Sequence, residues 1–172
     1  MKKIDEALTL SNPRLLTGIY FSLLAVIATL SIDALLYWAG VIQFVSISQE
    51  IFLAVIVAAC FGALFGERIV HCKKPYRKHV FLWAFLMVIV ALPIYNLGFL
   101  YFMKENHAEF FKHTTIEQLI SLYLFVSVYS FILAGVWLAI LAGVAALFLR
   151  GYLVYYIKQS LYKQRGQNSE PK

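Results

Sequence analysis

Charged residues are scarce in this sequence of 172 residues: Asp, Glu, Lys and Arg together make up 14% of it, whereas about a quarter is usual in a soluble domain. Cysteine, proline and glycine are also few, at 2, 4 and 9 residues, which excludes a disulfide-rich scaffold and a collagen-like or low-complexity chain. Hydrophobic residues are in excess, at 62% of the sequence. This composition excludes an ordinary soluble domain and predicts a polytopic membrane protein.

The apolar residues are gathered in four long blocks, separated by short polar segments. A helix needs about 20 mostly apolar residues to cross a bilayer, so four crossings nearly exhaust a chain of this length. We therefore predict an all-α fold, a bundle of four transmembrane helices that forms one domain over residues 1–158, followed by a polar tail at 159–172. The predicted spans are residues 15–40, 51–66, 80–102 and 119–149.

Capping residues indicate where the first and fourth of these helices begin. Asn12 is suited to cap the first helix, with Pro13 in its first turn, where the missing N–H costs nothing. Thr114 and Glu117 have the spacing of a capping box, which predicts that the fourth helix begins near Ile116.

The fourth apolar block is longer than a bilayer requires, because apolar residues continue past Arg150. A helix of this length must tilt, leave the membrane or bend. If it bends, we expect the kink near Gly143 or Gly151.

Lys and Arg are distributed unevenly over the connecting segments, and this distribution predicts the orientation of the chain. Thirteen of the fifteen lie on the side of the two termini and of the loop between the second and third spans, whereas only Lys104 and Lys112 lie on the other side. The positive-inside rule then places both termini in the cytoplasm. A bacterial inner membrane is the predicted location, with a eukaryotic or host endomembrane as the alternative.

The loop between the second and third spans carries the densest basic cluster. Such a cluster can bind anionic lipid headgroups, at roughly 1 kcal/mol per basic residue near the surface, or can serve only as an orientation signal. The net charge of +6 therefore has a topological explanation, and we predict no nucleic-acid partner because no separate domain exists to carry a basic groove. The candidate headgroup contacts are Arg68, Lys73, Lys74, Arg77 and Lys78.

Two spans carry stripes of small residues at four-residue spacing. Such a stripe lets another backbone approach closely, which is how helices associate where lipid removes the hydrophobic driving force. Two interpretations remain open: packing within one chain, or a seam with a second copy or another membrane protein. The second span has Ala54, Ala58, Gly62 and Gly66, and the fourth has Gly135, Ala139 and Gly143.

Three residues are candidates for a polar path. Asp33 is the only acidic residue well inside a predicted span, and it lies roughly 28 Å along the helix from Arg14, near the outer interface. Intramembrane carboxylates are costly and often serve as a proton relay or a cation pathway, although a structural role at the interface is the alternative. Pro93 is expected to bend the third helix, and Asn96 to point into the bundle.

Catalytic motifs are missing from the sequence. It has no paired thiols, no His-Glu-x-x-His, no second intramembrane Asp to pair with Asp33 and no glycine-rich phosphate loop. We therefore predict no catalytic residue, no metal site and no cofactor. The outer-loop residues Glu105, His107, Glu109 and His113 are interpreted as a solvated loop rather than as metal ligands.

These patterns favour a non-catalytic function. We expect a small integral membrane protein that acts as a structural or accessory subunit through helix–helix packing, surrounded by lipid and assembled into a homo- or hetero-oligomer with membrane proteins. The alternative is a small channel or transporter for an ion or polar solute, formed by an oligomer that brings Asp33 and Asn96 around a shared path.

Overall fold

The computed structural model describes residues 12–40, 45–72, 76–112 and 114–153. All of their regular structure is helical, with no strand among them, which confirms the predicted all-α fold. In chain order the elements are α1 (Pro13–Trp38), α2 (Ile47–Val70), α3 (Arg77–Asn106), α4 (Ala108–Phe111), α5 (Ile116–Ser130), the π-helical turn η2 (Phe131–Gly135), α6 (Val136–Phe148) and a second π-helical turn η3 (Leu149–Leu153).

Four helices are long and apolar enough to cross a membrane, as the sequence predicts. The first three are α1, α2 and α3, and the fourth is the continuous helix Ile116–Tyr152, which runs from α5 into η3. The second and third helices extend beyond the predicted spans at both ends, because polar residues at their ends still take helical conformation.

The first and fourth spans begin where the capping residues predict. Asn12 is the N-cap of α1, although its side chain makes no capping hydrogen bond. Thr115 and Gln118 form the capping box of α5: the Gln118 N–H donates to Thr115 Oγ1 at 3.4 Å, and the Thr115 N–H donates to Gln118 Oε1 at 3.0 Å. The predicted pairing of Thr114 with Glu117 is therefore wrong by one residue. Because α5 begins at Ile116, its N-cap is Thr115 and the third helical residue is Gln118.

The long fourth span departs from α-helical geometry at η2 and η3. Gly151 lies within η3, whereas Gly143 lies inside the regular helix α6. Gly143 faces the ring of Phe81 on α3, where a Cβ atom would lie 2.5 Å from Phe81 Cδ2. A tight helix contact, rather than backbone freedom, accounts for this glycine.

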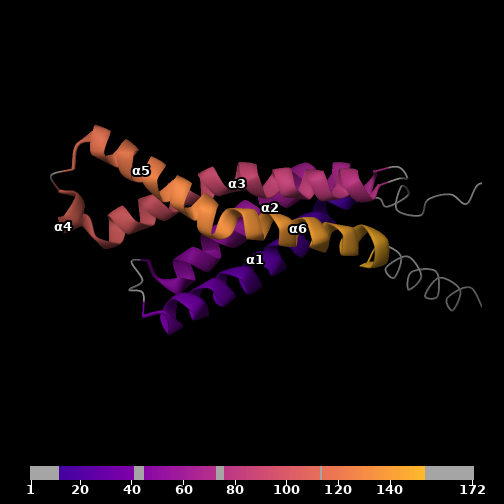
Figure 1. Cartoon of the computed structure of the whole chain (residues 1–172), viewed down its shortest axis with the longest axis horizontal. Coiled ribbons are helices and arrows are strands. Elements are labelled where there is room, and N and C mark those ends of the chain that lie inside the picture. The colour runs from indigo at the N-terminus through magenta and orange to yellow at the C-terminus, as the bar shows by residue number, and fades with distance from the viewer. Residues whose placement is uncertain (1–11, 41–44, 73–75, 113, 154–172) are drawn as a thin grey trace, which may run out of the picture.

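The helices pack closely at one end of the molecule and diverge at the other. α1 packs along α2, α2 on α3, and α3 on α6. Figure 1 shows that the α1–α2 pair separates from α3 and α5 toward the end that carries α4. The buried core lies at the opposite end, and its residues are Phe21, Ile69, Val70, Val80, Ala84, Met87, Ala146 and Leu149.

The stripe on α2 is filled by α1. A Cβ atom at Gly62 would lie 2.9 Å from the carbonyl oxygen of Thr17 and 3.1 Å from the Cα atom of Gly18. At Gly66 a Cβ atom would overlap Thr17 Oγ1. Thr17 is fully buried there. Its hydroxyl group lies 2.8 Å from the Gly62 carbonyl oxygen and 2.8 Å from the Pro13 carbonyl oxygen of its own helix, and it shares its one proton between these acceptors. Further along the stripe, Ala54 is buried and Ala58 is partly buried.

The stripe on the fourth span is filled by α3. A Cβ atom at Gly135 would lie 2.7 Å from Leu92 Cδ1, and Ala139 is fully buried. Both stripes therefore pack within the chain, so a partner helix has to use another surface of the molecule.

Gly62→Ala should lower the free energy of unfolding by about 1–3 kcal/mol, because the new methyl group meets the backbone of α1, which cannot move aside without separating the helices. The measurement is denaturant-induced unfolding of the detergent-solubilised protein, followed by circular dichroism. Gly151→Ala is the matched control, since a Cβ atom there has its nearest neighbour, Tyr76 Oη, at 3.9 Å. Equal stability of the two variants would contradict the role assigned to the α1–α2 contact.

Candidate functional site

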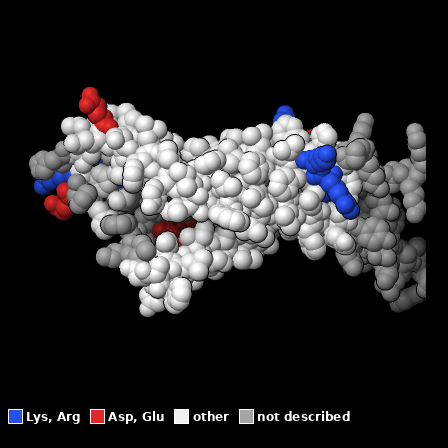
Figure 2. All heavy atoms as spheres, viewed as in Figure 1, with Lys and Arg blue, Asp and Glu red and all other residues white. Residues whose placement is uncertain are grey.

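Asp33 is a buried acidic residue in the half of the molecule where the helices diverge. It lies five residues before the end of α1, and its residue surface is 5% exposed. Figure 2 shows acidic atoms set back in a hollow on the flank of this half, apart from the acidic groups at the tip. Most of the remaining surface is formed by uncharged residues.

Glu50 brings a second carboxyl group to Asp33. α2 begins at Ile47, four residues before the predicted span, so Glu50 belongs to the first turn of the helix, where it is half-buried. Its carboxyl group lies within hydrogen-bonding reach of the carboxyl group of Asp33. The predicted span excluded Glu50, so the sequence analysis missed this pair. The position of the two residues on either side of the connection is the signal that was overlooked: Asp33 lies five residues before the end of α1, and Glu50 three residues after the start of α2.

Residues of α3 complete the polar cluster. Tyr95 is partly buried, and its phenol group lies within electrostatic range of both Glu50 and Asp33. Asn96, on the same turn, is 3% exposed. Asp33, Glu50 and Tyr95 therefore come from three different helices and face one region. We call these three residues the carboxyl cluster.

Pro93 lies apart from the carboxyl cluster. α3 runs unbroken through it from Arg77 to Asn106, and Pro93 itself is exposed. The hydroxyl group of Tyr123 on α5 donates to the Pro93 carbonyl oxygen at 3.2 Å. Pro93 therefore belongs to the contact between α3 and α5, whereas Asp33 and Asn96 are both buried.

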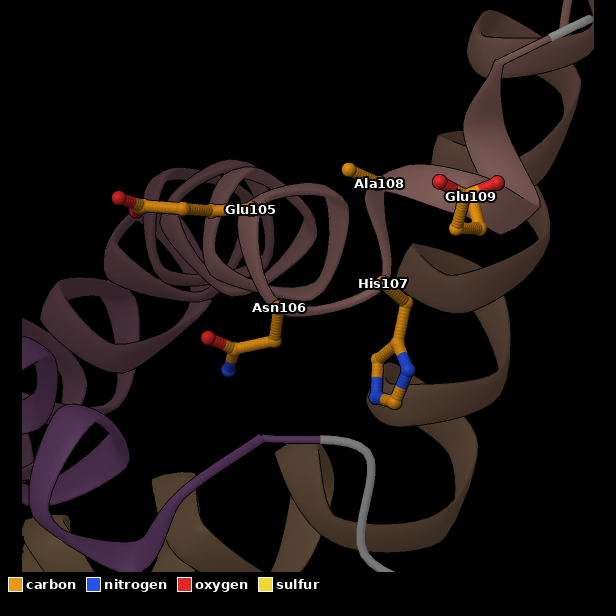
Figure 3. A pocket seen from close by; sticks show the side chains of 5 residues that line it. All are labelled: Glu105, Asn106, His107, Ala108 and Glu109. Carbon is orange, nitrogen blue, oxygen red and sulfur yellow. The ribbon is translucent and has the colours of Figure 1, made fainter.

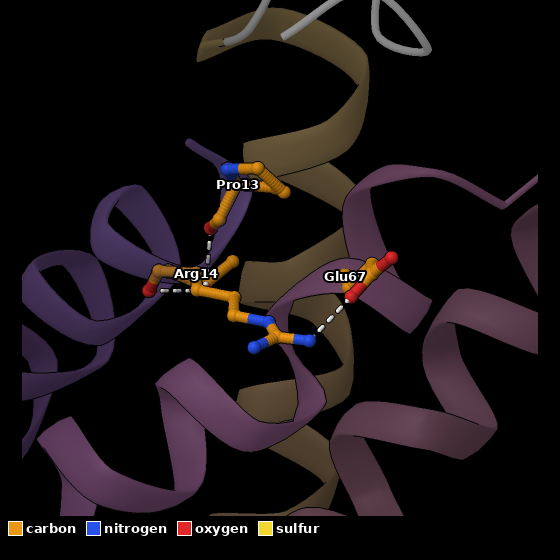
Figure 4. A network of polar contacts seen from close by, with 4 residues as sticks. Pro13, Arg14 and Glu67 are labelled. Carbon is orange, nitrogen blue, oxygen red and sulfur yellow. Dashed lines mark hydrogen bonds and ion pairs between the residues drawn. The ribbon is translucent and has the colours of Figure 1, made fainter. Parts of the chain in front are cut away.

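The carboxyl cluster has no cationic partner in the part of the chain that the structure describes. The ion pair found there joins Arg14 to Glu67 at 2.8 Å, between the start of α1 and the end of α2 (Figure 4). Both of those side chains are more than half exposed, so this pair contributes little to stability. The two carboxyl groups at Asp33 and Glu50 are left to interact with each other.

Basic residues gather at the end opposite the carboxyl cluster. The guanidinium group of Arg68 lies 4.5 Å from the centre of the Trp83 ring. Arg77 and Lys78 are exposed at the start of α3. Lys73 and Lys74, the other two candidates for headgroup contact, lie outside the described residues.

Arg150 at this end is buried, in contrast to Arg68. Its Nη2 atom donates to the carbonyl oxygen of Cys72 at 3.2 Å, and its guanidinium group lies 4.7 Å from the centre of the Tyr76 ring. These contacts link the end of the fourth span to the connection between α2 and α3. The link closes the basic end of the bundle.

The outer-loop residues line a shallow hollow at the end of α3 (Figure 3). The side chains of Glu105, His107 and Glu109 point in different directions in this view. Within the described ranges no group of three His, Cys, Asp or Glu residues is arranged to hold a metal ion. His113 lies outside those ranges.

No family model matches the chain, and neither a curated protein nor a solved structure matches it. A function for this chain must therefore be inferred from its own residues. Two features of the structure are open to such an inference: the carboxyl cluster and the weakly packed helix α5.

Arg150→Lys should lower the free energy of unfolding by about 1 kcal/mol, because a lysine keeps the charge but loses the planar contact with the Tyr76 ring in a buried setting. Arg68→Lys is the matched control, because Arg68 makes a similar ring contact while exposed to its surroundings. Chemical unfolding of both variants measures the difference. If Arg68→Lys lowered the free energy of unfolding as much as Arg150→Lys, burial of the arginine would not account for the loss of stability.

Proposed function

We propose that the chain is a small integral membrane protein that acts without catalysis, as a structural or accessory subunit that binds other membrane proteins. In this proposal it spans the membrane four times with both termini in the cytoplasm, and it resides in a bacterial inner membrane. The charge distribution of the sequence supports this orientation through the positive-inside rule. Because the small-residue stripes pack within the chain, the surface that binds another protein must lie on a different part of the molecule.

The observation that carries the proposal is that helix α5 packs weakly on its own chain. None of its 15 residues is buried. Ile116 is 76% exposed and Phe125 65% exposed, and further on Leu133 of η2 is 63% exposed. Figure 1 shows α5 leaning away from the α1–α2 pair at the divergent end of the molecule.

Polar groups on the exposed face of α5 favour a protein neighbour over lipid alone. Tyr129 is 57% exposed, and its ring stacks on Phe125 with 5.6 Å between centroids. Ser121, two turns earlier, is exposed as well. A hydroxyl group that faces hydrocarbon without a hydrogen-bond partner is unfavourable, and a neighbouring helix can supply that partner. This pattern therefore supports a binding surface on α5.

A photo-crosslinking amino acid at Leu124 on α5 should give one defined protein adduct in intact membranes. The same amino acid at Leu23 on α1, another exposed position on an apolar helix, is the matched control and should give lipid adducts only. Gel analysis and mass spectrometry of the adducts distinguish a second copy of the chain from a different subunit. Lipid adducts alone at both positions would refute the proposal.

A channel or transporter formed by an oligomer is the second candidate function, and the carboxyl cluster supports it. A path within one chain would have to cross the buried core, which includes Phe21 and Met87, so a path between copies is the form that fits this packing. Intramembrane carboxyl groups commonly serve proton or cation movement.

In proteoliposomes, Asp33→Asn should abolish any cation or proton flux that the wild-type protein supports, because it removes the charge at the carboxyl cluster while keeping the shape of the side chain. A pH-sensitive dye inside the vesicles, and a sodium-sensitive dye in parallel, measure the flux. Glu117→Gln, at the exposed start of α5, is the control. Equal flux in Asp33→Asn and the wild type would exclude this second function.

A further inference from the structure

The pair of carboxyl groups at Asp33 and Glu50 requires a positive charge that the described chain does not provide. Oδ2 of Asp33 is buried, and no N–H or O–H group of a described residue donates to it. The group within hydrogen-bonding reach is the carboxyl group of Glu50, and a carboxyl group donates only when it is protonated. If both groups were ionised and no cation lay between them, two like charges would be in contact away from bulk water, which is strongly unfavourable.

The groups that face this pair cannot supply the missing charge. Asp33 comes from α1, Glu50 from α2 and Tyr95 from α3, and the electrostatic partners of Glu50 and Tyr95 belong to this same cluster. A phenol group is neutral or negative, never positive. No Lys, Arg or His in the described ranges forms an ion pair with either carboxyl group. Since no described residue supplies the neutralising charge, a proton or cation from solution is the source that we consider.

We propose that Asp33 and Glu50 form a binding site for a single positive charge, either one proton shared by the two carboxyl groups or a small hard cation such as Na⁺. Carboxylate oxygens are the ligands that hard cations prefer, and the nearby Tyr95 hydroxyl group offers a further oxygen. This proposal is separate from both proposed functions, because a positive charge can bind at these carboxyl groups whether or not the chain binds a partner protein or transports an ion.

The site opens toward the end of the molecule at which α1 ends and α2 begins. Glu50 is only half-buried and lies in the first turn of α2, one turn from the end of the helix. The flank of this half is hollowed where acidic atoms are visible (Figure 2). At the opposite end the core of the bundle is closed. Proton or cation exchange is therefore expected from one side of the membrane.

Infrared spectroscopy of the purified full chain in lipid nanodiscs tests the proposal. Spectra are recorded across a pH series, first with N-methylglucamine as the cation, which is too large for the site, and then with Na⁺ at the same ionic strength. The variants are Asp33→Asn and Glu50→Gln, both nearly isosteric with the native residues. Glu117→Gln is the matched control, because Glu117 also lies in the first turn of its helix but is exposed. The unfolding temperature of each sample is measured in parallel.

A bound proton should give the C=O stretching band of a protonated carboxyl group at neutral pH in the wild type and Glu117→Gln, with that band lost or shifted in Asp33→Asn and Glu50→Gln. A bound sodium ion should weaken this band and raise the unfolding temperature as Na⁺ replaces N-methylglucamine, again only where both carboxyl groups are present. Either result supports the site and identifies its ligand. If the wild type shows neither a protonated carboxyl band at neutral pH nor a response to Na⁺, the proposal is overturned, whether or not the two variants fold.

Discussion

The close approach of the α1 and α2 backbones is the contact on which the rest of the structure depends. Gly62 and Gly66 leave room for Thr17, whose hydroxyl group donates to the Gly62 carbonyl oxygen at 2.8 Å. This contact sets the register of two antiparallel helices, and the same register recurs where Arg14 meets Glu67. Asp33 lies about 24 Å further along α1, at a rise of about 1.5 Å per residue, so the register set by the glycines also decides which residue of α2 it meets.

The molecule combines a tightly packed end with an end at which its helices diverge. At the packed end, Arg150 links the fourth span to Cys72 and Tyr76. At the divergent end, the first turn of α2 and the buried Asp33 share a region that no described cation neutralises. Apolar packing and a few polar contacts, among them the hydrogen bond from Arg150 to the Cys72 carbonyl oxygen, hold the first end together. The second end retains two carboxyl groups that no described cation neutralises. Groups of this kind are rarely kept inside an apolar protein unless they bind something.

The sequence predicted the number of long helices and their approximate positions, because the lengths of its apolar blocks leave few alternatives. The carboxyl pair was not predicted, because Glu50 lies outside the predicted second span, in the segment that precedes it. Only the observed start of α2 at Ile47 turns that side chain into a neighbour of Asp33. The π-helical turn η2 was equally hidden, because no residue type in Phe131–Gly135 requires it. The lengths and positions of the helices could therefore be predicted from the sequence, whereas the contacts between helices could not.

The two features that carry functional proposals lie on different helices. The carboxyl cluster is built from α1, α2 and α3, whereas the exposed face that includes Phe125 and Tyr129 belongs to α5, which makes its main contacts with α3 and η2. Tyr123 bonds to the carbonyl oxygen of Pro93, three residues before Asn96 and two before Tyr95, so this hydrogen bond is the short route by which the two features can influence each other. A partner that displaced α5 would lengthen or break this bond, which is made to the turn of α3 that holds Tyr95. If loss of this bond changed the affinity of the carboxyl cluster for a positive charge, binding of that charge would by linkage change the affinity at α5 by the same factor.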